Sequence, residues 1–173
     1  MDIFLLNFFK TVSIFGSETA LIIFLTIISL LLFFSKKRKR LASFVFFNYL
    51  LSMIMVAALK VVIQKPRSLL ALAEEKSYAF PSGHVALAMT TFLLLFFISD
   101  LIKNNFWKNF LKVFAIFWIL ATISARLYLR VHDIPDIVTS LLLAVFVFII
   151  SLTIPSFRKH LLRKEIQNKD IKI

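Results

Sequence analysis

Five long apolar runs divide this chain, and they constrain its fold more than any other feature. Each run is long enough to cross the hydrocarbon core of a bilayer, which takes about 20 helical residues. The runs cover residues 17–34, 41–63, 84–102, 110–130 and 134–155. Because 60% of the 173 residues are hydrophobic, a water-soluble core could not enclose this much apolar surface. The sequence therefore predicts an all-α integral membrane protein with about five transmembrane helices, forming one domain over residues 1–173.

The two ends of the chain differ from these runs. Residues 1–14 are apolar but short, and Asn7 and Lys10 interrupt them, so we expect an interfacial helix in the membrane plane. A cleaved signal peptide is the alternative. It is disfavoured because five consecutive cations, residues 36–40, follow the first run where a small-residue cleavage site would stand. Residues 156–173 are interpreted as a basic cytoplasmic tail that contacts anionic lipid headgroups, not nucleic acid.

The distribution of Lys and Arg predicts the orientation of the chain. Residues 36–40, 103–112 and 156–173 carry 14 of the 21 cations, and an odd number of spans places all three segments on one side. Since cytoplasmic loops are enriched in Lys and Arg, this side is expected to face the cytoplasm. The loop 64–83 and the turn 131–133 then face outward. The composition favours a bacterial inner membrane, with the outer side in the periplasm.

Six outward cations are left unexplained by this topology, and they point to chemistry instead: Lys60, Lys65, Arg67, Lys76, Arg126 and Arg130. Ionisable groups at the ends of membrane helices are costly to place and mark functional sites by default. The absence of cysteine excludes disulfides, thiol catalysis and cysteine-ligated metals. The acidic pair Glu74 and Glu75 is interpreted as a solvated edge of the outer loop rather than a metal site.

The tetrad Pro81-Ser82-Gly83-His84 stands directly before the third apolar run. Ser82 is a favourable N-cap, so a helix is expected to begin here. Helix N-termini bind anions through unpaired N–H groups and the positive end of the dipole, and glycine lets a phosphate approach the backbone. His84 can then act as a proton donor. The alternative is an ordinary serine-capped helix with an interfacial histidine.

A second cluster joins Arg126, Arg130, His132 and Asp136 around the entry to the fifth run. The spacing of four residues predicts a hydrogen bond between Asp136 and His132, which fixes the imidazole tautomer and leaves the other nitrogen free to attack. Asp133 is expected to cap the helix. One arginine can bind a ligand while the other extends to the headgroups. Alternatively, both arginines extend outward and Asp136 pairs with one of them.

A third cluster precedes the other two along the chain. It begins with Lys60 near the end of the second run and finishes with Arg67 in the outer loop. Lys60 alone is weak evidence, because a lysine three residues from a helix end can extend harmlessly to the interface. Pro66 stiffens the backbone directly before Arg67, which suits a guanidinium aimed at phosphate oxygens.

The three clusters, in this order, resemble the signature of the type 2 phosphatidic acid phosphatase (PAP2) superfamily. That signature is written K-x6-R-P, P-S-G-H and S-R-x5-H-x3-D. The matching residues here are Lys60 with Arg67, then Pro81-Ser82-Gly83-His84, then Arg126 with His132 and Asp136. Two departures occur, with Ser68 in place of Pro and Ala125 in place of Ser. Ser68 is expected to loosen the turn after Arg67, and Ala125 lacks a hydroxyl for the phosphate or a neighbouring helix.

The resemblance implies a PAP2-like helical bundle and a metal-independent lipid phosphatase without cofactors. His132 would attack phosphorus, Asp136 would orient it, and His84 would protonate the leaving oxygen. The remaining residues implied to bind the phosphoryl oxygens are Lys60, Arg67, Arg126, Ser82 and Gly83. The family's bacterial substrates include phosphatidylglycerol phosphate, undecaprenyl diphosphate, phosphatidic acid and lipid A 1-phosphate, and the extra outer cations favour a highly charged headgroup.

Two other classes of function are alternatives to a lipid phosphatase. A small transporter or channel subunit would carry polar residues through its spans, but the middles of the third to fifth runs are almost wholly apolar. An inactive lipid-binding scaffold would not need the complete set of motif residues. The expected partners are a phosphorylated lipid and the bilayer, with no nucleic acid and no obligate protein partner evident.

Overall fold

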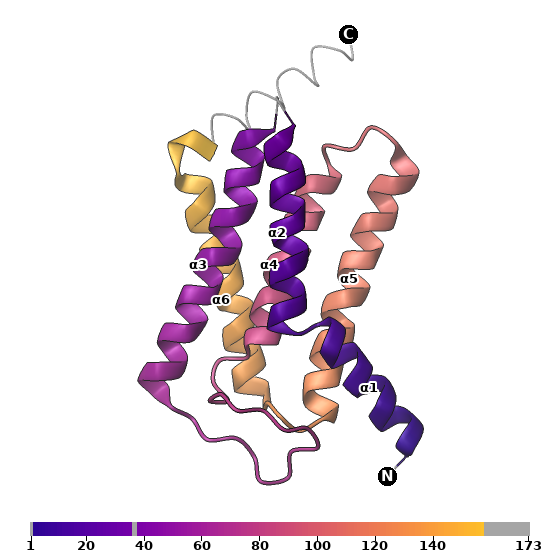
Figure 1. The fold of residues 1–173 in the computed structure, drawn as a ribbon, viewed down its shortest axis with the longest axis vertical. Coiled ribbons are helices and arrows are strands. Elements are labelled where there is room, and N and C mark those ends of the chain that lie inside the picture. The colour runs from indigo at the N-terminus through magenta and orange to yellow at the C-terminus, as the bar shows by residue number, and fades with distance from the viewer. Residues whose placement is uncertain (1, 36–37, 158–173) are drawn as a thin grey trace.

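The computed structural model describes residues 2–35 and 38–157, and these form six α-helices. The elements are α1 Ile3–Phe15, α2 Glu18–Phe34, α3 Lys39–Ile63, α4 Gly83–Ser99, α5 Asn105–Tyr128 and α6 Ile134–Thr153. Helices α2 to α6 run up and down side by side, and α1 projects from the lower end of the bundle in Figure 1. The predicted all-α fold class is confirmed. Most of the predicted tail, 156–173, lies outside the described residues.

Helix α4 occupies the middle of the bundle and packs against α2, α3, α5 and α6. Its small residues permit this close approach, and Ala86 and Ala88 are fully buried. Polar side chains inside the bundle are hydrogen-bonded in pairs, as between Ser52 and Thr90 at 2.9 Å. Such pairs connect helices where water cannot satisfy them. Their small number agrees with the apolar interiors expected from the sequence.

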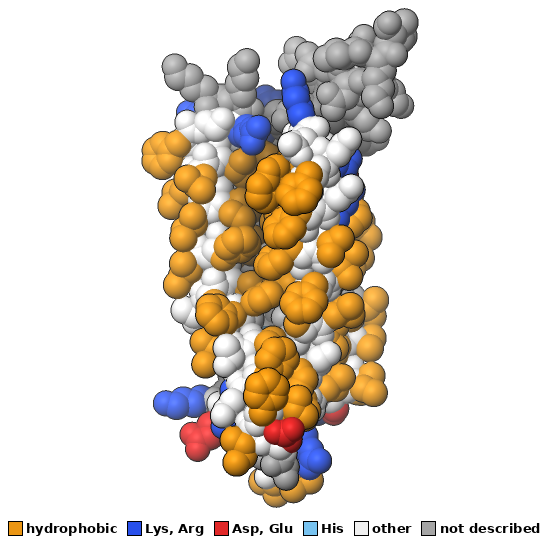
Figure 2. Space-filling model, turned by 90° about the vertical axis from the view of Figure 1, so that its right-hand side faces the viewer, with side chains coloured by type: hydrophobic (Ala, Val, Ile, Leu, Met, Phe, Trp, Pro, Cys, Tyr) orange, Lys and Arg blue, Asp and Glu red, His pale blue; other side chains and the backbone are white. Residues whose placement is uncertain are grey.

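The outer surface of the bundle suits a bilayer. Figure 2 shows a face on which hydrophobic side chains cover the middle, with charged side chains gathered toward the two ends. By length and composition, α3, α5 and α6 can each cross a membrane, and α1 with α2, bent by 41° at their junction, can form a fourth span. Helix α4 has 17 residues, or about 25 Å at 1.5 Å per residue. The other helices enclose it, so its apolar surface faces protein more than lipid.

Three connections meet at the lower end of the bundle in Figure 1: the α1–α2 junction, the loop 64–82 and the turn 129–133. Gln64 ends α3 in the left-handed region, with φ of 49°, and turns the chain across the bundle. The loop is attached by backbone hydrogen bonds from Leu72 to Leu129 at 2.8 Å and from Ala79 to Lys65 at 2.9 Å. This end is called the motif end below, because all three sequence clusters converge on it.

Candidate active site

The His132–Asp136 pair lies at the start of α6. Asp133 caps the helix and accepts a hydrogen bond from the Asp136 N–H, while the Asp136 side chain accepts one from the Asp133 N–H, forming a capping box. This local fold holds Asp136 so that its Oδ2 is 3.3 Å from His132 Nδ1. The predicted carboxylate–imidazole contact and the predicted cap are both confirmed. The arrangement places the proton of His132 on Nδ1 and leaves Nε2 as a hydrogen-bond acceptor.

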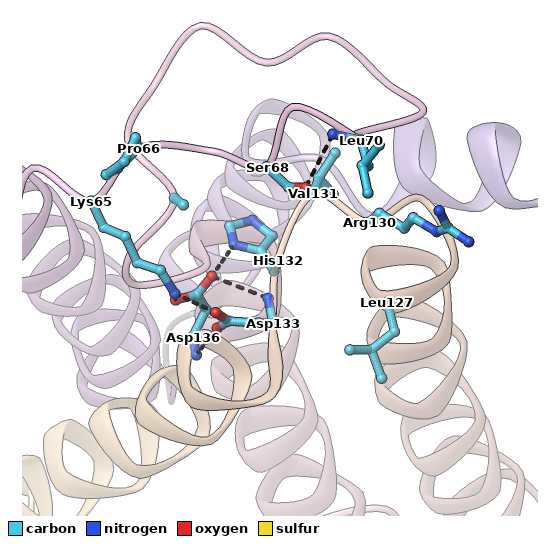
Figure 3. Close-up of a pocket in the computed structure, with 11 residues that line it drawn as sticks. Lys65, Pro66, Ser68, Leu70, Leu127, Arg130, Val131, His132, Asp133 and Asp136 are labelled. Atoms are coloured by element: carbon cyan, nitrogen blue, oxygen red, sulfur yellow. Dashed lines mark hydrogen bonds and ion pairs between the residues drawn. The ribbon is translucent and has the colours of Figure 1, made fainter.

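Lys65 binds the other side of the same carboxylate. Its Nζ is 2.7 Å from Asp136 Oδ1 and 2.5 Å from Asp133 Oδ2, and Figure 3 shows the lysine reaching from the loop toward both acids. Asp136 is almost fully buried, and the Lys65 ammonium offsets part of the cost of burying its carboxylate. The Lys65 ammonium is therefore paired with acids of the site in this structure.

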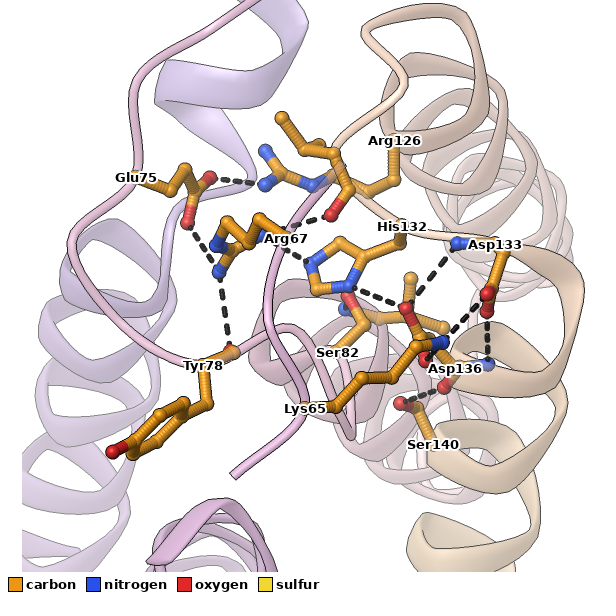
Figure 4. A network of polar contacts seen from close by, with 12 residues as sticks. Lys65, Arg67, Glu75, Tyr78, Ser82, Arg126, His132, Asp133, Asp136 and Ser140 are labelled. Atoms are coloured by element: carbon orange, nitrogen blue, oxygen red, sulfur yellow. Dashed lines mark hydrogen bonds and ion pairs between the residues drawn. The ribbon is translucent and has the colours of Figure 1, made fainter. Parts of the chain in front are cut away.

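Arg67 is the centre of the polar network in Figure 4. Its Nη1 donates to the Val131 carbonyl at 2.9 Å and lies 3.4 Å from His132 Nε2. Its Nε donates to the Ser77 carbonyl at 2.7 Å, which fixes the plane of the guanidinium. Arg67 therefore presents positive charge directly beside His132 Nε2.

Glu75 connects Arg67 to Arg126. One carboxylate oxygen is 3.1 Å from Arg67 Nη2, and the other accepts a hydrogen bond from Arg126 Nη2. Burial raises the pKa of Glu75, but the positive charges, above all Arg126, outweigh this and leave the pKa below its ordinary value. The prediction of a solvated edge is therefore wrong for Glu75, whereas Glu74 is exposed.

Arg126 is completely buried near the end of α5. Besides Glu75, it donates from Nη1 to the Ser13 hydroxyl of α1 at 2.5 Å, while its Nε has no partner among the described residues. Arg130, by contrast, lies beyond the end of α5 with a φ of 54° and is exposed. Of the two alternatives drawn from the sequence, the structure agrees with the one in which a single arginine points inward. Arg130 lies outside α5.

Ser82, Gly83 and His84 are buried at the N-terminus of α4. Ser82 caps the helix by accepting from the Val85 N–H, as predicted. A Cβ at Gly83 would overlap the Glu18 carboxylate in its present position, so the end of that flexible side chain would have to move aside. The same carboxylate lies 4.0 Å from His84 Nδ1. An anionic group thus lies near the second histidine.

Lys60 extends from the last turn of α3 into the loop. Its Nζ donates to the Tyr78 carbonyl at 2.7 Å and to the Ser77 hydroxyl at 3.2 Å, and the residue is buried. Lys60 is thus not extended to the membrane surface, which was the harmless interpretation of its position. It shares Ser77 with Arg67, whose Nη2 is 3.2 Å from the same hydroxyl.

The charges of the three motifs act on one imidazole. Burial first, and then the positive charges of Arg126, Arg67 and Lys60, lower the pKa of His132 below its ordinary value. A neutral His132 whose Nε2 carries no proton, with these cations nearby, can attack an electrophilic centre that carries negative charge once Arg67 yields this nitrogen to it. Within the described residues, no group of three or more His, Asp or Glu side chains forms a metal site.

A cavity of about 350 Å³ opens beside His132. Its polar wall includes Lys65, His132 and Asp136, and its apolar wall includes Leu70 and Leu127. The mixed lining suits an amphiphile with a charged group at the site and hydrocarbon beside it.

Sequence reasoning located the motif residues but missed four partners: Ser13, Glu18, Lys65 and Glu75. Ser13 and Glu18 precede the motifs by more than 40 residues, and nothing in their surroundings distinguishes them. Lys65 and Glu75 are charged residues in an irregular loop, so no periodicity indicates which way they point. Their charge was the only available signal.

Comparisons with known proteins agree on family and fold. The family profile described as PAP2 superfamily matches residues 41–160. A crystal structure of a transmembrane PAP2 type phosphatidylglycerolphosphate phosphatase from Bacillus subtilis is similar, with a TM-score of 0.72 and 22% identity. The similarity covers 87% of this chain and 76% of that chain. No curated protein matches the chain.

Proposed function

The chain belongs to the PAP2 superfamily, and we propose that it hydrolyses a phosphate monoester or diphosphate on a lipid headgroup through a phosphohistidine intermediate. As a PAP2-family protein with this fold, it is a multi-pass membrane lipid phosphatase. The observation that carries the finer proposal is the environment of His132. Its Nδ1 faces Asp136 at 3.3 Å, and its Nε2 faces the Arg67 guanidinium at 3.4 Å.

In the first step, the lone pair of His132 Nε2 forms a bond to phosphorus and the bond to the lipid oxygen breaks. His84 donates a proton to that oxygen, so the lipid leaves as a neutral alcohol, or as a phosphate from a diphosphate. The phosphorylated imidazole carries positive charge, which the Asp136 carboxylate offsets. In the second step, His84 takes a proton from water, the water oxygen attacks phosphorus and the P–N bond breaks.

Binding of the phosphoryl group is assigned to the cations around Nε2 and to the start of α4. Lys60, Arg67 and Arg126 offset the negative charge of the substrate and of the transition state. Ser82 and the Gly83 N–H complete the set. Three fixed cations supply the charge that a metal ion supplies in other phosphatases, so metal independence follows from the proposal.

The substrate is proposed to be a bilayer lipid whose phosphate reaches the membrane boundary. The candidates are lipid A 1-phosphate, undecaprenyl diphosphate, phosphatidylglycerol phosphate and phosphatidic acid, and one enzyme can accept several. The mixed lining of the cavity at His132 supports an amphiphilic substrate. Arg130 and Lys76, both exposed at the motif end, support a headgroup with several negative charges.

Purified protein should release inorganic phosphate from at least one of these four lipids in the presence of a metal chelator. The measurement is initial phosphate release in mixed micelles, with a phosphodiester lipid as the control that should yield none. Complete dependence of the rate on added magnesium would refute the cation argument. Absence of release from all four lipids would refute the assigned substrate class.

The motif end is proposed to face the periplasm or cell exterior, with the C-terminus in the cytoplasm. Because the chain has no cysteine, single cysteines report topology cleanly. A Lys76→Cys variant should react with a membrane-impermeant thiol reagent in intact cells. The matched variant Lys103→Cys, in the exposed connection between α4 and α5, should react only after lysis. The reverse labelling pattern would invert this orientation.

A further inference from the structure

The two arginines assigned to the phosphoryl group already hold an anion, the carboxylate of Glu75. Each oxygen of this carboxylate faces a different guanidinium, which is how arginines also hold two oxygens of a phosphate. We propose that Glu75 is an internal, singly charged competitor for the phosphoryl site. Dianionic phosphate monoesters and diphosphates displace it, whereas the phosphodiester lipids of the bilayer do not. This inference rests on the proposed function and adds the basis of its selectivity.

Glu75 has a clear structural role while no substrate is bound. Arg126 is completely buried, and a buried charge without an ionic partner is strongly destabilising. The hydroxyl of Ser13 alone cannot neutralise it. The positive surroundings hold the pKa of Glu75 below its ordinary value, so its carboxylate is ionised at neutral pH. An occupant of like charge must therefore be exchanged whenever a phosphate binds.

The exchange needs movement of only one side chain. The loop is attached to the turn after α5 by the Leu72 N–H, which donates to the Leu129 carbonyl at 2.8 Å, and its two arms are joined by Ala79 N–H donating to the Lys65 carbonyl at 2.9 Å. Glu75 lines two cavities, of about 620 and 630 Å³. One is lined by Lys10 and Ser13, the other by Lys60 and Arg67. The Glu75 side chain can move into the first while a phosphate takes its place.

The charge of the lipid phosphate then determines whether the lipid displaces Glu75. A phosphodiester carries one negative charge, so it replaces Glu75 without electrostatic gain and with added bulk. A phosphate monoester carries about 1.5 to 2 negative charges at pH 7 and gains attraction from both guanidiniums. Most bilayer phospholipids are diesters, so a site with free arginines would fill with lipids that it is not proposed to hydrolyse.

The opposite role for Glu75 is to orient the arginines for substrate, and the two roles predict opposite results. If Glu75 competes, its removal strengthens anion binding. If it orients the arginines, its removal weakens binding. The Glu75→Gln variant separates them, because the amide retains the size and some hydrogen bonds of the side chain but loses the charge. Glu74→Gln is the matched control, since Glu74 is exposed one residue away.

The test measures the affinity of the purified full-length protein for inorganic phosphate by calorimetry in detergent. Glu75→Gln should bind phosphate about tenfold more tightly, as expected when an internal ligand occupies the site about nine-tenths of the time. Phosphatidylglycerol, a diester, should inhibit phosphate release by this variant more strongly than by the unaltered protein. Glu74→Gln should change neither quantity. Unchanged or weaker phosphate binding by Glu75→Gln overturns the inference.

A second variant covers failure to fold, and two further outcomes keep this test distinct from that of the proposed function. If Glu75→Gln does not fold, Glu75→Asp retains the charge on a shorter side chain and should bind phosphate several-fold more tightly. Unchanged or weaker binding by Glu75→Asp overturns the inference equally. Protein that binds phosphate but releases none from any lipid rejects the phosphatase proposal without affecting the binding comparison. Normal hydrolysis with unchanged binding rejects only the role of Glu75.

Discussion

His132→Ala is expected to reduce phosphate release by roughly 10⁴-fold or more, because it removes the atom that attacks phosphorus. The Nε2 of His132 is unprotonated, buried and adjacent to Arg67, and Asp136 holds the ring by its other nitrogen. His84 belongs to a different helix and faces Glu18, so it cannot take over this position. The measurement is the initial rate of phosphate release from the best substrate of the lipid panel.

The control for this variant is binding rather than rate. His132→Ala retains the cations of the site, so its affinity for inorganic phosphate should stay within a few-fold of the unaltered protein. Substrate labelled in its phosphate should leave an acid-labile, base-stable label on the unaltered protein but none on His132→Ala. Retention of more than about one per cent of the rate would reject His132 as the nucleophile.

The helices could be predicted closely from the sequence because their signals are local. The apolar runs correspond to α2 to α6, and the caps at Ser82 and Asp133 mark the first residues of α4 and α6. The error at α5 has a local cause as well. The apolar run is expected to begin at residue 110, but the helix begins earlier, at Asn105, after the cap Asn104. Its first turn includes Phe106 and Trp107, which are tolerated at a membrane interface. The end of the run is expected at Arg130, whose positive φ lies outside any helix.

The contacts of the site differ in the same way: the local ones could be predicted from the sequence and the long-range ones could not. His132 and Asp136 are four residues apart across the start of α6, so their contact follows from spacing. Lys65 and Asp136 are 71 residues apart, Glu75 and Arg126 are 51 apart, and Ser13 and Arg126 are 113 apart. These pairs depend on how an irregular loop and a bent helix cross the bundle end. No sequence period encodes that path, which is why the partners were missed while the motif residues were found.

The missed partners change how the site operates. With the motif residues alone, the three cations form an open anion-binding site. With the partners present, Lys60 is bound to Tyr78, and the two arginines share Glu75. Asp136 is likewise held by Lys65 as well as by His132. Under the role proposed for Glu75, substrate binding exchanges one ionic partner of the two arginines for another.

His84→Ala should separate the two chemical steps, because the need for a proton donor depends on the leaving group. With a lipid alkyl phosphate, loss of the acid should slow turnover by about 10²- to 10⁴-fold. With an aryl phosphate, the phenolate leaves readily without a proton, so the first step should be nearly unaffected. The second step still needs His84 to activate water. The phosphohistidine should therefore accumulate, giving a burst of one phenol per protein followed by slow turnover.

The comparison of substrates makes this test specific to the assigned role. If His84 only maintained the structure at the start of α4, His84→Ala would slow both substrates equally and show no burst. A burst of phenol release that coincides with base-stable label on the protein would place His84 after the nucleophile in the sequence of events. The unaltered protein serves as the control and should show no burst and only a low level of label, because the proposed base His84 speeds hydrolysis of the intermediate. If the variant hydrolysed each substrate as fast as the unaltered protein does, another group would be the proton donor.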